Sequence, residues 1–336
     1  MRTCVGTFFV TLILTTAGLS APPIPVIFDT DMGNDIDDAL ALAVIHALES
    51  RGECRLLAVT ITKDHPDATR FIAAINNFYG RGDVPLGMVQ RGKTPEPSNY
   101  LRGIVDAKDV HGQPLYPTRL KSSDAIPSAV TTLRKSLAEQ ADGAVVIIQV
   151  GFSTNLIALL DSPADHLSNL PGKDLVAKKV RLLSVMAGNF AATERTKEYN
   201  VFIDAPAARK LFAHWPTSIL ASGFEIGRVI KYPASSIEHD FSYIPHHPVA
   251  EAYRLYDKMP YDRETWDLTS VLAAVRPDQG YFGLSDPGEI SVDDADITQF
   301  RYLSGGKHRY LTVSPDQIVR VRESLVQLTS QPPGRP

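Results

Sequence analysis

Short apolar runs alternate with helical patterns along nearly the whole chain of 336 residues. Six of these runs are rich in Val, Ile and Leu without polar alternation, which is typical of strands covered on both faces. They lie at Val26–Asp29, Leu56–Thr62, Val84–Val89, Ala144–Val150, Val180–Met186 and Ser218–Ala221. Helical patterns lie at Asp37–Glu49, Pro66–Tyr79, Ala125–Gln140, Ser153–Leu160, Ala205–Ala213 and Pro315–Leu328. This order predicts an α/β fold with an open, largely parallel sheet flanked by helices.

The beginning of the chain follows the order of a secretory signal. Arg2 precedes an apolar run that starts at Val5, and small residues follow that run. We therefore expect a signal peptide at residues 1–21, one domain at residues 22–330 and a disordered tail at residues 331–336. Such a protein would be secreted or periplasmic. Two segments, residues 90–124 and 223–263, show no clear pattern, and long loops of this kind are often functional.

The overall composition is that of an ordinary globular domain, with 44% hydrophobic residues, 21% charged residues and a net charge of −4. This balance gives no reason to expect nucleic acid or an anionic membrane as a partner. We therefore expect a small-molecule ligand and no membrane contact after removal of the signal, and a homo-oligomer stays open. Cys54 would be the one cysteine left after cleavage, and its apolar neighbours predict a buried thiol.

Acidic residues crowd where the first predicted strand passes to the first predicted helix, in the stretch VIFDTDMGNDIDDALALAVIHAL that begins at Val26. The aspartates of this stretch are Asp29, Asp31, Asp35, Asp37 and Asp38. The last two fall in the first helical turn, where the positive end of the helix dipole favours carboxylates. That effect explains one or two acidic residues but not five, because like charges repel. A hard cation such as Ca²⁺, with its several oxygen ligands, explains the whole set.

Two other interpretations of the acidic stretch differ in what they require. An EF-hand needs an acidic residue at the last position of its loop, where this chain has Leu40, so this interpretation is rejected. A phosphatase of the haloacid-dehalogenase type fits the start Asp29-Thr30-Asp31 but not the residues that follow. It remains the alternative enzyme.

The chain resembles the inosine-uridine preferring nucleoside hydrolases from about Val26 to Val275. The family motifs D-x-D-x-G and D-D-A match Asp29–Gly33 and Asp37–Ala39, and a slightly longer segment between them leaves Asp35 as a spare carboxylate. Later landmarks follow in the family's order: His111–Gly112, IIQVGFSTNL at Ile147–Leu156, VMAGN at Val185–Asn189, EYN at Glu198–Asn200 and WDLTSVLAAV at Trp266–Val275.

This resemblance implies a nucleoside hydrolase fold and Ca²⁺-dependent hydrolysis of the N-glycosidic bond of ribonucleosides, which releases ribose and a nucleobase. It assigns the metal to the side chains of Asp31, Asp38 and Asp267 and to the backbone carbonyl of Val150. Asp31 would also be the general base. The residues that would bind the substrate are Asp37, Asn189, Glu198, Asn200, His111 and Trp266.

The chain departs from the family pattern at three places, one of which is a slightly shorter stretch between VMAGN and EYN, the stretch from which Asn189 is carried over. Trp266 stands where many members have a His that can protonate the leaving base; a Trp cannot do so, but it can stack on a base or fill a core. Lys63 and Asp64 follow the second strand where the family often has an Asn. A metal-dependent riboside-binding protein without turnover is therefore a second hypothesis.

Other aromatic and titratable residues have two interpretations each. Several tyrosines, such as Tyr253, Tyr256 and Tyr261, could line a base pocket or cover a core. His246 and His247 are expected in a solvated loop rather than at a metal. Glu225 follows a strand end and is a speculative site residue.

Overall fold

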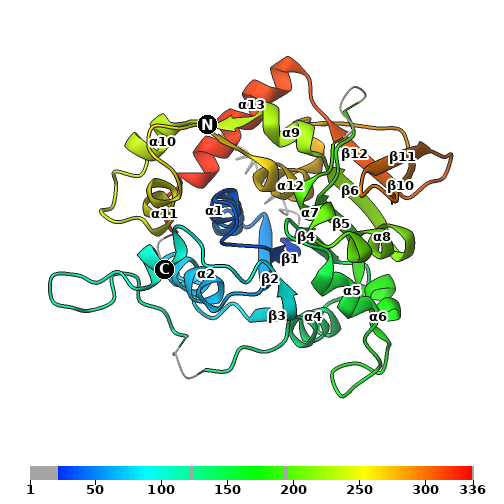
Figure 1. The fold of residues 1–336 in the computed structure, drawn as a ribbon, viewed down its shortest axis with the longest axis horizontal. Coiled ribbons are helices and arrows are strands. Elements are labelled where there is room, and N and C mark those ends of the chain that lie inside the picture. The colour runs from blue at the N-terminus through cyan, green and yellow to red at the C-terminus, as the bar shows by residue number, and fades with distance from the viewer. Residues whose placement is uncertain (1–21, 121–123, 192–195, 335–336) are drawn as a thin grey trace, which may run out of the picture.

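A central sheet of parallel strands organises the molecule. A computed structural model of the protein describes residues 22–120, 124–191 and 196–334 (Figure 1). Within that part, the six predicted strands are all present and form the parallel core. Their order across the sheet is β3 (Leu86–Lys93), β2 (Cys54–Lys63), β1 (Ile24–Thr30), β4 (Val145–Gln149), β5 (Val180–Met186) and β6 (Ser218–Ser222). The chain order reverses between β1 and β4, so this pair is the topological switch point.

Helices cover both faces of the sheet, as predicted (Figure 1). Along β1, Val26 and Phe28 enter one hydrophobic core while Ile27 enters the other, because successive side chains of a strand point to opposite faces. The helices of the first core include α1 (Asp37–Ser50), α2 (Pro66–Phe78), α11 (Pro248–Tyr256), α12 (Trp266–Val275) and α13 (Pro315–Thr329). The helices of the second core are α4 (Ala129–Ala138), α5 (Thr154–Leu160), α6 (Gly172–Lys179) and α8 (Ala205–His214), with α7 (Tyr199–Phe202) beside them.

Four further strands extend the sheet beyond β6, and the sequence interpretation missed them. β12 (His308–Thr312) pairs parallel with β6, and β10 (Gly288–Val292), β11 (Thr298–Tyr302) and β9 (Gly283–Leu284) add antiparallel pairs. These strands are short and half-exposed, so they lack the continuous apolar runs that marked the central strands. The turn residues between them, Asp293–Asp296 and Ser304–Gly306, were the available signal for hairpins.

The prediction of a long loop at residues 223–263 is wrong. This segment contains α9 (Phe224–Val229), β7 (Lys231–Tyr232), α10 (Ala234–His239) and α11, and β7 pairs with β8 (Arg263–Glu264). Proline lies at the cap of α10 and in the first turn of α11, where its missing N–H costs nothing. Residues 90–124 hold the end of β3 and the short α3 (Leu101–Val105).

The prediction of a solvated His246–His247 pair is wrong for His247. The His247 side chain is buried, accepts a hydrogen bond from the Val249 N–H at 3.2 Å and so caps α11. The rings of Phe78, Phe241 and Tyr243 surround it. His246 is exposed, as expected.

The predicted signal peptide at residues 1–21 and the end of the predicted tail lie outside the described residues. Within the tail, the Gln331 side chain accepts a hydrogen bond from Arg51 and donates one to Ser50. Across residues 22–120, 124–191 and 196–334, every helix is too short or too polar to cross a membrane.

Gly151 lets the end of β4 approach the loop that follows β1. A Cβ atom at this position would lie 2.4 Å from Thr62 Oγ1 and 2.6 Å from the Asp31 backbone nitrogen. The Val150 N–H donates to the Asp29 carbonyl at 2.7 Å, which fixes this approach. The switch point is therefore closed by a contact that only glycine permits.

We predict that Gly151→Ala lowers the free energy of unfolding by about 1–3 kcal/mol, because the added methyl group forces β4 away from the acidic loop. Urea unfolding measures this loss. Gly143→Ala is the control: Gly143 has φ +62 and open space, so that variant carries backbone strain far from the loop. If Gly151→Ala were no less stable than the unchanged protein, the close approach of β4 to the loop would not need a glycine.

Candidate active site

Three carboxylates meet at the carboxyl-terminal edge of the sheet, beside the switch point. Asp37, Asp38 and Asp267 are buried, and each offers an oxygen atom within 4.8 Å of the others. Asp37 and Asp38 begin α1, and Asp267 lies in the first turn of α12. The Asp267 N–H donates to Asp37 Oδ2 at 3.1 Å. Two helix N-termini thus supply the positive ends of their dipoles to one acidic cluster.

Ionisation of the three carboxylates is unfavourable, because they are buried and repel one another. Burial raises the pKa values of Asp37, Asp38 and Asp267 well above the ordinary range, and the neighbouring carboxylates raise them further. Thr30 Oγ1 donates to Asp38 Oδ1, but Asp38 Oδ2 is buried without a hydrogen-bond partner. A buried carboxylate oxygen without a donor is costly, and a cation removes that cost.

Asp31 lies on the loop between β1 and the cluster. It is buried to 4% exposure, and burial together with repulsion from Asp35 raises its pKa to about 6. Asn34 Nδ2 donates to Asp31 Oδ2 at 2.8 Å. Asp29 lies two residues earlier, in β1, and accepts hydrogen bonds from Thr60 Oγ1 at 2.5 Å and from Asn155 Nδ2 at 2.8 Å. Asp29 therefore anchors β1 to β2 and α5.

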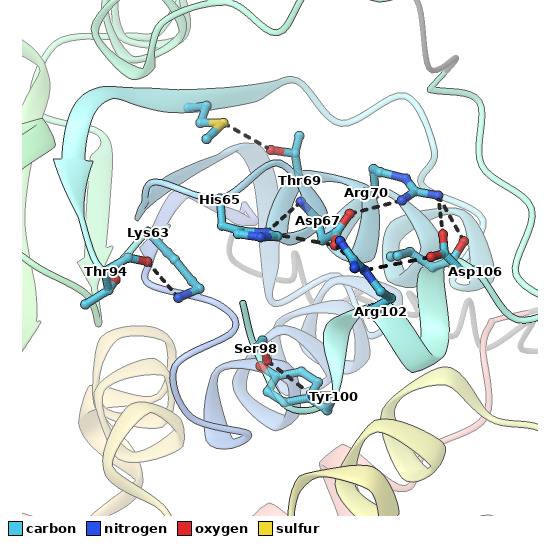
Figure 2. A network of polar contacts seen from close by, with 12 residues as sticks. Lys63, His65, Asp67, Thr69, Arg70, Thr94, Ser98, Tyr100, Arg102 and Asp106 are labelled. Carbon is cyan, nitrogen blue, oxygen red and sulfur yellow. Dashed lines mark hydrogen bonds and ion pairs between the residues drawn. The ribbon is translucent and has the colours of Figure 1, made fainter. Parts of the chain in front are cut away.

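Contacts from α3 and β8 hold the acidic loop from outside. The Tyr100 hydroxyl donates to the Asp35 carbonyl at 2.7 Å, and the Asp35 carboxylate pairs with Arg263. Asp67, at the start of α2, pairs with Arg70 at 3.0 Å and with Arg102 of α3 at 3.6 Å (Figure 2). These ion pairs tie α3 to α2 and so position Tyr100 against the loop.

A cavity of about 430 Å³ opens above the cluster. Its lining combines acidic, polar, cationic and aromatic residues: Asp31, Asn34, Asp35, Asp37, Met186, Lys197, Glu198, Tyr199, Asn200, Phe202, Phe224, Tyr256, Arg263, Trp266 and Asp267. A cavity of about 650 Å³ also lies between α2 and α4, but it does not include the cluster.

Glu198 and Asn200 contribute polar groups to the cavity lining. Asn200 Nδ2 donates to the Val150 carbonyl at 2.8 Å and to the Met186 carbonyl at 3.2 Å. The Glu198 carboxylate accepts from the N–H groups of Gly188, Asn200 and Val201, and burial raises its pKa to about 7. Glu198 thus caps α7 and joins it to the end of β5.

Aromatic residues also line the cavity. The Trp266 ring stacks on Phe224 with centroids 5.4 Å apart, and Trp266 Nε1 donates to the Phe224 carbonyl at 2.9 Å. The Arg263 guanidinium lies 5.2 Å from the ring centroids of both Trp266 and Tyr256. Trp266 therefore packs against the hydrophobic core and also lines the cavity.

The cavity and the cluster together bring Asp31, Asp37, Asp38, Asp267, Glu198, Asn200 and Trp266 to one place. Val150 is in neither group, but its carbonyl accepts a hydrogen bond from Asn200 of the cavity lining. Asp37, which was expected on the ribose, lies in the three-carboxylate cluster itself.

Two expected site residues lie elsewhere in the structure. Asn189 is buried behind the cavity wall, where its side chain donates to Thr196 at 2.8 Å and accepts from Ala191. His111 is exposed after α3, and the cavity lining does not include it.

Tyr256 lines the cavity, as one of its two sequence interpretations had it, whereas Tyr253 and Tyr261 are not in the lining. Arg263 also lines the cavity but was not selected from the sequence, since its segment was taken for a loop.

The fold and the cluster define an α/β protein that carries a candidate metal centre and a ligand cavity at the switch point of its sheet. Comparison with known proteins gives the family. The chain belongs to the inosine-uridine preferring nucleoside hydrolase family, whose sequence model matches residues 26–313. This confirms the resemblance and the predicted fold class. The family is metal-dependent, and in the described part of this chain Asp37, Asp38 and Asp267 form a group suited to an ion.

Individual relatives differ in their stated specificity. A pyrimidine-specific ribonucleoside hydrolase, RihA, from Citrobacter koseri is 29% identical over 199 residues, and the match spans 56% of this chain and 56% of that relative. A plant nucleoside hydrolase has a similar structure, with a TM-score of 0.67, 21% identity and coverage of 93% of this chain and 100% of the other. A purine-preferring ribonucleoside hydrolase from Gardnerella vaginalis has a TM-score of 0.69 at 17% identity, covering 92% and 99%.

We predict that chelated protein becomes less stable as the pH rises from 6.5 to 8.5. Asp29 and Glu198 each have a pKa of about 7, above the unfolded value of about 4, so their protonated forms stabilise the fold and this contribution is lost as they ionise. Burial lowers the pKa of His46 to about 4 and that of His247 to about 3, so their opposite contribution is gained mostly below the unfolded value of about 6.5 and adds little above it.

Thermal unfolding in excess chelator at the two pH values measures this effect. A saturating divalent metal ion should raise the midpoint more at pH 8.5 than at 6.5, because a cation favours the ionised carboxylates. A midpoint that rises with pH in chelator would show that the acidic site does not govern stability in this range.

Proposed function

We propose that this protein is a Ca²⁺-dependent ribonucleoside hydrolase, which cleaves the N-glycosidic bond and releases ribose and a nucleobase. The observation that carries the proposal is the convergence of Asp37, Asp38 and Asp267, from distant parts of the chain, at a cavity lined by both polar and aromatic residues. Ribose is rich in hydroxyl groups and a nucleobase is flat and aromatic, so these two kinds of lining residue match the two halves of a nucleoside.

The residues present fit a hard cation. The candidate ligands are carboxylate and carbonyl oxygens, which Ca²⁺ prefers, and the buried Asp38 Oδ2 lacks any other partner. Asp31, Asp38, Asp267 and the Val150 carbonyl are the proposed ligands, and Asp37 lies close enough to join them. When bound, the cation supplies Lewis acidity that makes a water molecule easier to deprotonate.

The side chains around the cavity perform the remaining steps. Water attacks the anomeric carbon of ribose while the bond to the base nitrogen breaks, and Asp31 accepts the proton of the water. The carboxylates favour the positive charge that develops on the sugar. Asn200, whose amide nitrogen is held by the Val150 and Met186 carbonyls, turns its oxygen to a ribose hydroxyl, and Glu198 fixes the backbone of that segment.

The base lies against Trp266 and Phe224. The electron pair of the broken bond goes to the base nitrogen, and because the residue before Asp267 is not a histidine, the base takes its proton from water. Arg263, which lies against the Trp266 and Tyr256 rings, can donate a hydrogen bond to an acceptor on the base. Asp35 thus serves as the partner that holds Arg263 at the cavity.

The setting of the enzyme is part of the proposal. The sequence pattern of residues 1–21 supports export, so the protein would act on extracellular or periplasmic nucleosides. Its partner is then a small molecule, and homo-oligomerisation is left open. The alternative is a riboside-binding protein without turnover, favoured by the absence of a histidine before Asp267.

We predict that uridine or inosine incubated with the protein and Ca²⁺ yields free ribose, and that excess chelator stops the release. The matching 2′-deoxynucleoside should react at least about 10²-fold more slowly, because polar groups that bind the 2′-hydroxyl would be left unpaired. A reducing-sugar assay measures both. Binding without ribose release would favour the alternative, and release that survives complete metal removal would contradict the mechanism.

We predict that Asp38→Asn abolishes Ca²⁺ binding by calorimetry and lowers ribose release by at least about 10³-fold, since it replaces a charged ligand by an amide of the same size. The fold should survive because the amide oxygen can still accept from Thr30. Asp161→Asn is the matched control, as Asp161 pairs with Lys210 on the surface. Full activity in Asp38→Asn would remove Asp38 from the ligand set.

A further inference from the structure

A buried lysine stands beside the acidic loop. Lys63 is the last residue of β2, and only 2% of it is exposed. Its ammonium group donates to the Asn34 side-chain oxygen at 2.9 Å and to the Thr94 carbonyl at 2.7 Å, and the second of these contacts is visible in Figure 2. Its stem packs under Gly33, where a Cβ atom would lie 3.1 Å from Lys63 Cδ. The contacts with Asn34 and Gly33 place the side chain against the loop that carries Asp31, and the contact with Thr94 joins it to the segment after β3.

The charge of Lys63, together with the Asp31 carboxylate, fixes which way the Asn34 amide points. An ammonium group has donors and no acceptor, so the atom of Asn34 that faces it must be the oxygen. The amide nitrogen then faces the other way, where it donates to Asp31 Oδ2 at 2.8 Å and to Thr94 Oγ1 at 3.1 Å. The reversed amide would place its oxygen against the Asp31 carboxylate and its nitrogen against the ammonium, and both contacts would be repulsive.

We propose that Lys63 is a positioning residue that acts through Asn34 on Asp31. By fixing the amide, Lys63 makes Asn34 hold one oxygen of the Asp31 carboxylate, which leaves the other oxygen for the proposed cation and the attacking water. This inference rests on the proposed function, in which Asp31 accepts the proton of that water.

Two simpler roles for Lys63 make different predictions. If Lys63 only neutralised the carboxylates, any loss of its charge would have the same effect, whichever group replaced it. If it only tied the end of β3 through the Thr94 carbonyl, its removal would act independently of Asn34. The positioning role requires a donor at this place, and it requires Asn34 to be present.

The test compares Lys63→Met, Lys63→Gln, Asn34→Ala and the Lys63→Met/Asn34→Ala double variant in ribose release from uridine or inosine. Lys63→Met should lower kcat about tenfold with KM changed less than about threefold, because a hydrogen bond to a charged group is lost while substrate contacts remain. The double variant should lose no more than Asn34→Ala alone, since the two residues act in one chain. Lys63→Gln should keep most of the turnover, because its amide can still donate to Asn34.

Ca²⁺ affinity, measured by calorimetry, separates positioning from damage to the site. Lys63→Met should bind Ca²⁺ equally well or more tightly, since a cation near the carboxylates has been removed. Lys210→Met is the control, because Lys210 pairs with Asp161 at the surface. Losses in kcat that multiply in the double variant, equal losses in Lys63→Gln and Lys63→Met, or weakened Ca²⁺ binding in Lys63→Met would each overturn the proposal.

A readout that does not depend on turnover keeps this inference separate from the proposed function. The side-chain NH₂ of Asn34, identified by its absence from the NMR spectrum of Asn34→Ala, should exchange with solvent at least about tenfold faster in Lys63→Met than in the unchanged protein. Unchanged exchange would overturn the positioning role even if the enzyme is active. An inactive unchanged protein with this exchange pattern would contradict the proposed function but not the arrangement.

Discussion

Mutual repulsion among buried carboxylates is the constraint on which the rest of this structure depends. Asp37, Asp38 and Asp267 are each nearly inaccessible, and their pKa values rise because burial and neighbouring charge both disfavour ionisation. The protein offsets part of this cost with two helix N-termini and with the Thr30 hydroxyl. It leaves the rest uncompensated, as the unpaired Asp38 Oδ2 shows. For a site of this kind, the free energy of binding a cation adds to the free energy of folding.

The strand order explains why such a cluster can exist at this place. At the switch point, β1 and β4 are neighbours but their following segments leave in opposite directions, so a gap opens above their ends. The acidic loop fills one side of the gap, the segment after Val150 fills another, and α12 enters from a distant part of the chain. Gly151 permits the closest of these approaches. Cavity-lining residues such as Glu198 and Asn200 come from the segment after β5, and Phe224 comes from the segment after β6. These are the next strands in the sheet.

The sequence alone predicted the six central strands and singled out the carboxylates of the cluster. Strands such as Val145–Gln149 are apolar throughout because they are buried on both faces, and this pattern survives in any context. The five aspartates were informative because no local effect accounts for so many. The added strands near the C-terminus, such as Thr298–Tyr302, are partly exposed and leave no comparable pattern.

The contributions of Arg263, Asn34 and Lys63 could not be read from spacing. Each depends on a tertiary contact between segments distant in the chain, as in the pairing of Arg263 with Asp35. The prolines and histidines of residues 223–263 suggested a loop, although they cap helices there. The displacement of Asn189 and His111 from the cavity also follows from loop geometry, which a motif match does not constrain.

The hydrogen bond from the Asp267 N–H to Asp37 joins residues 230 positions apart. The group of three carboxylates is incomplete until the first helix and the late helix α12 have met. It can therefore form only after distant parts of the chain have come together. A protein synthesised or exported from its amino end would carry its first acidic residues unassembled until nearly all of the chain had emerged. Ion uptake would then act as a signal of finished folding, and truncated molecules would remain empty.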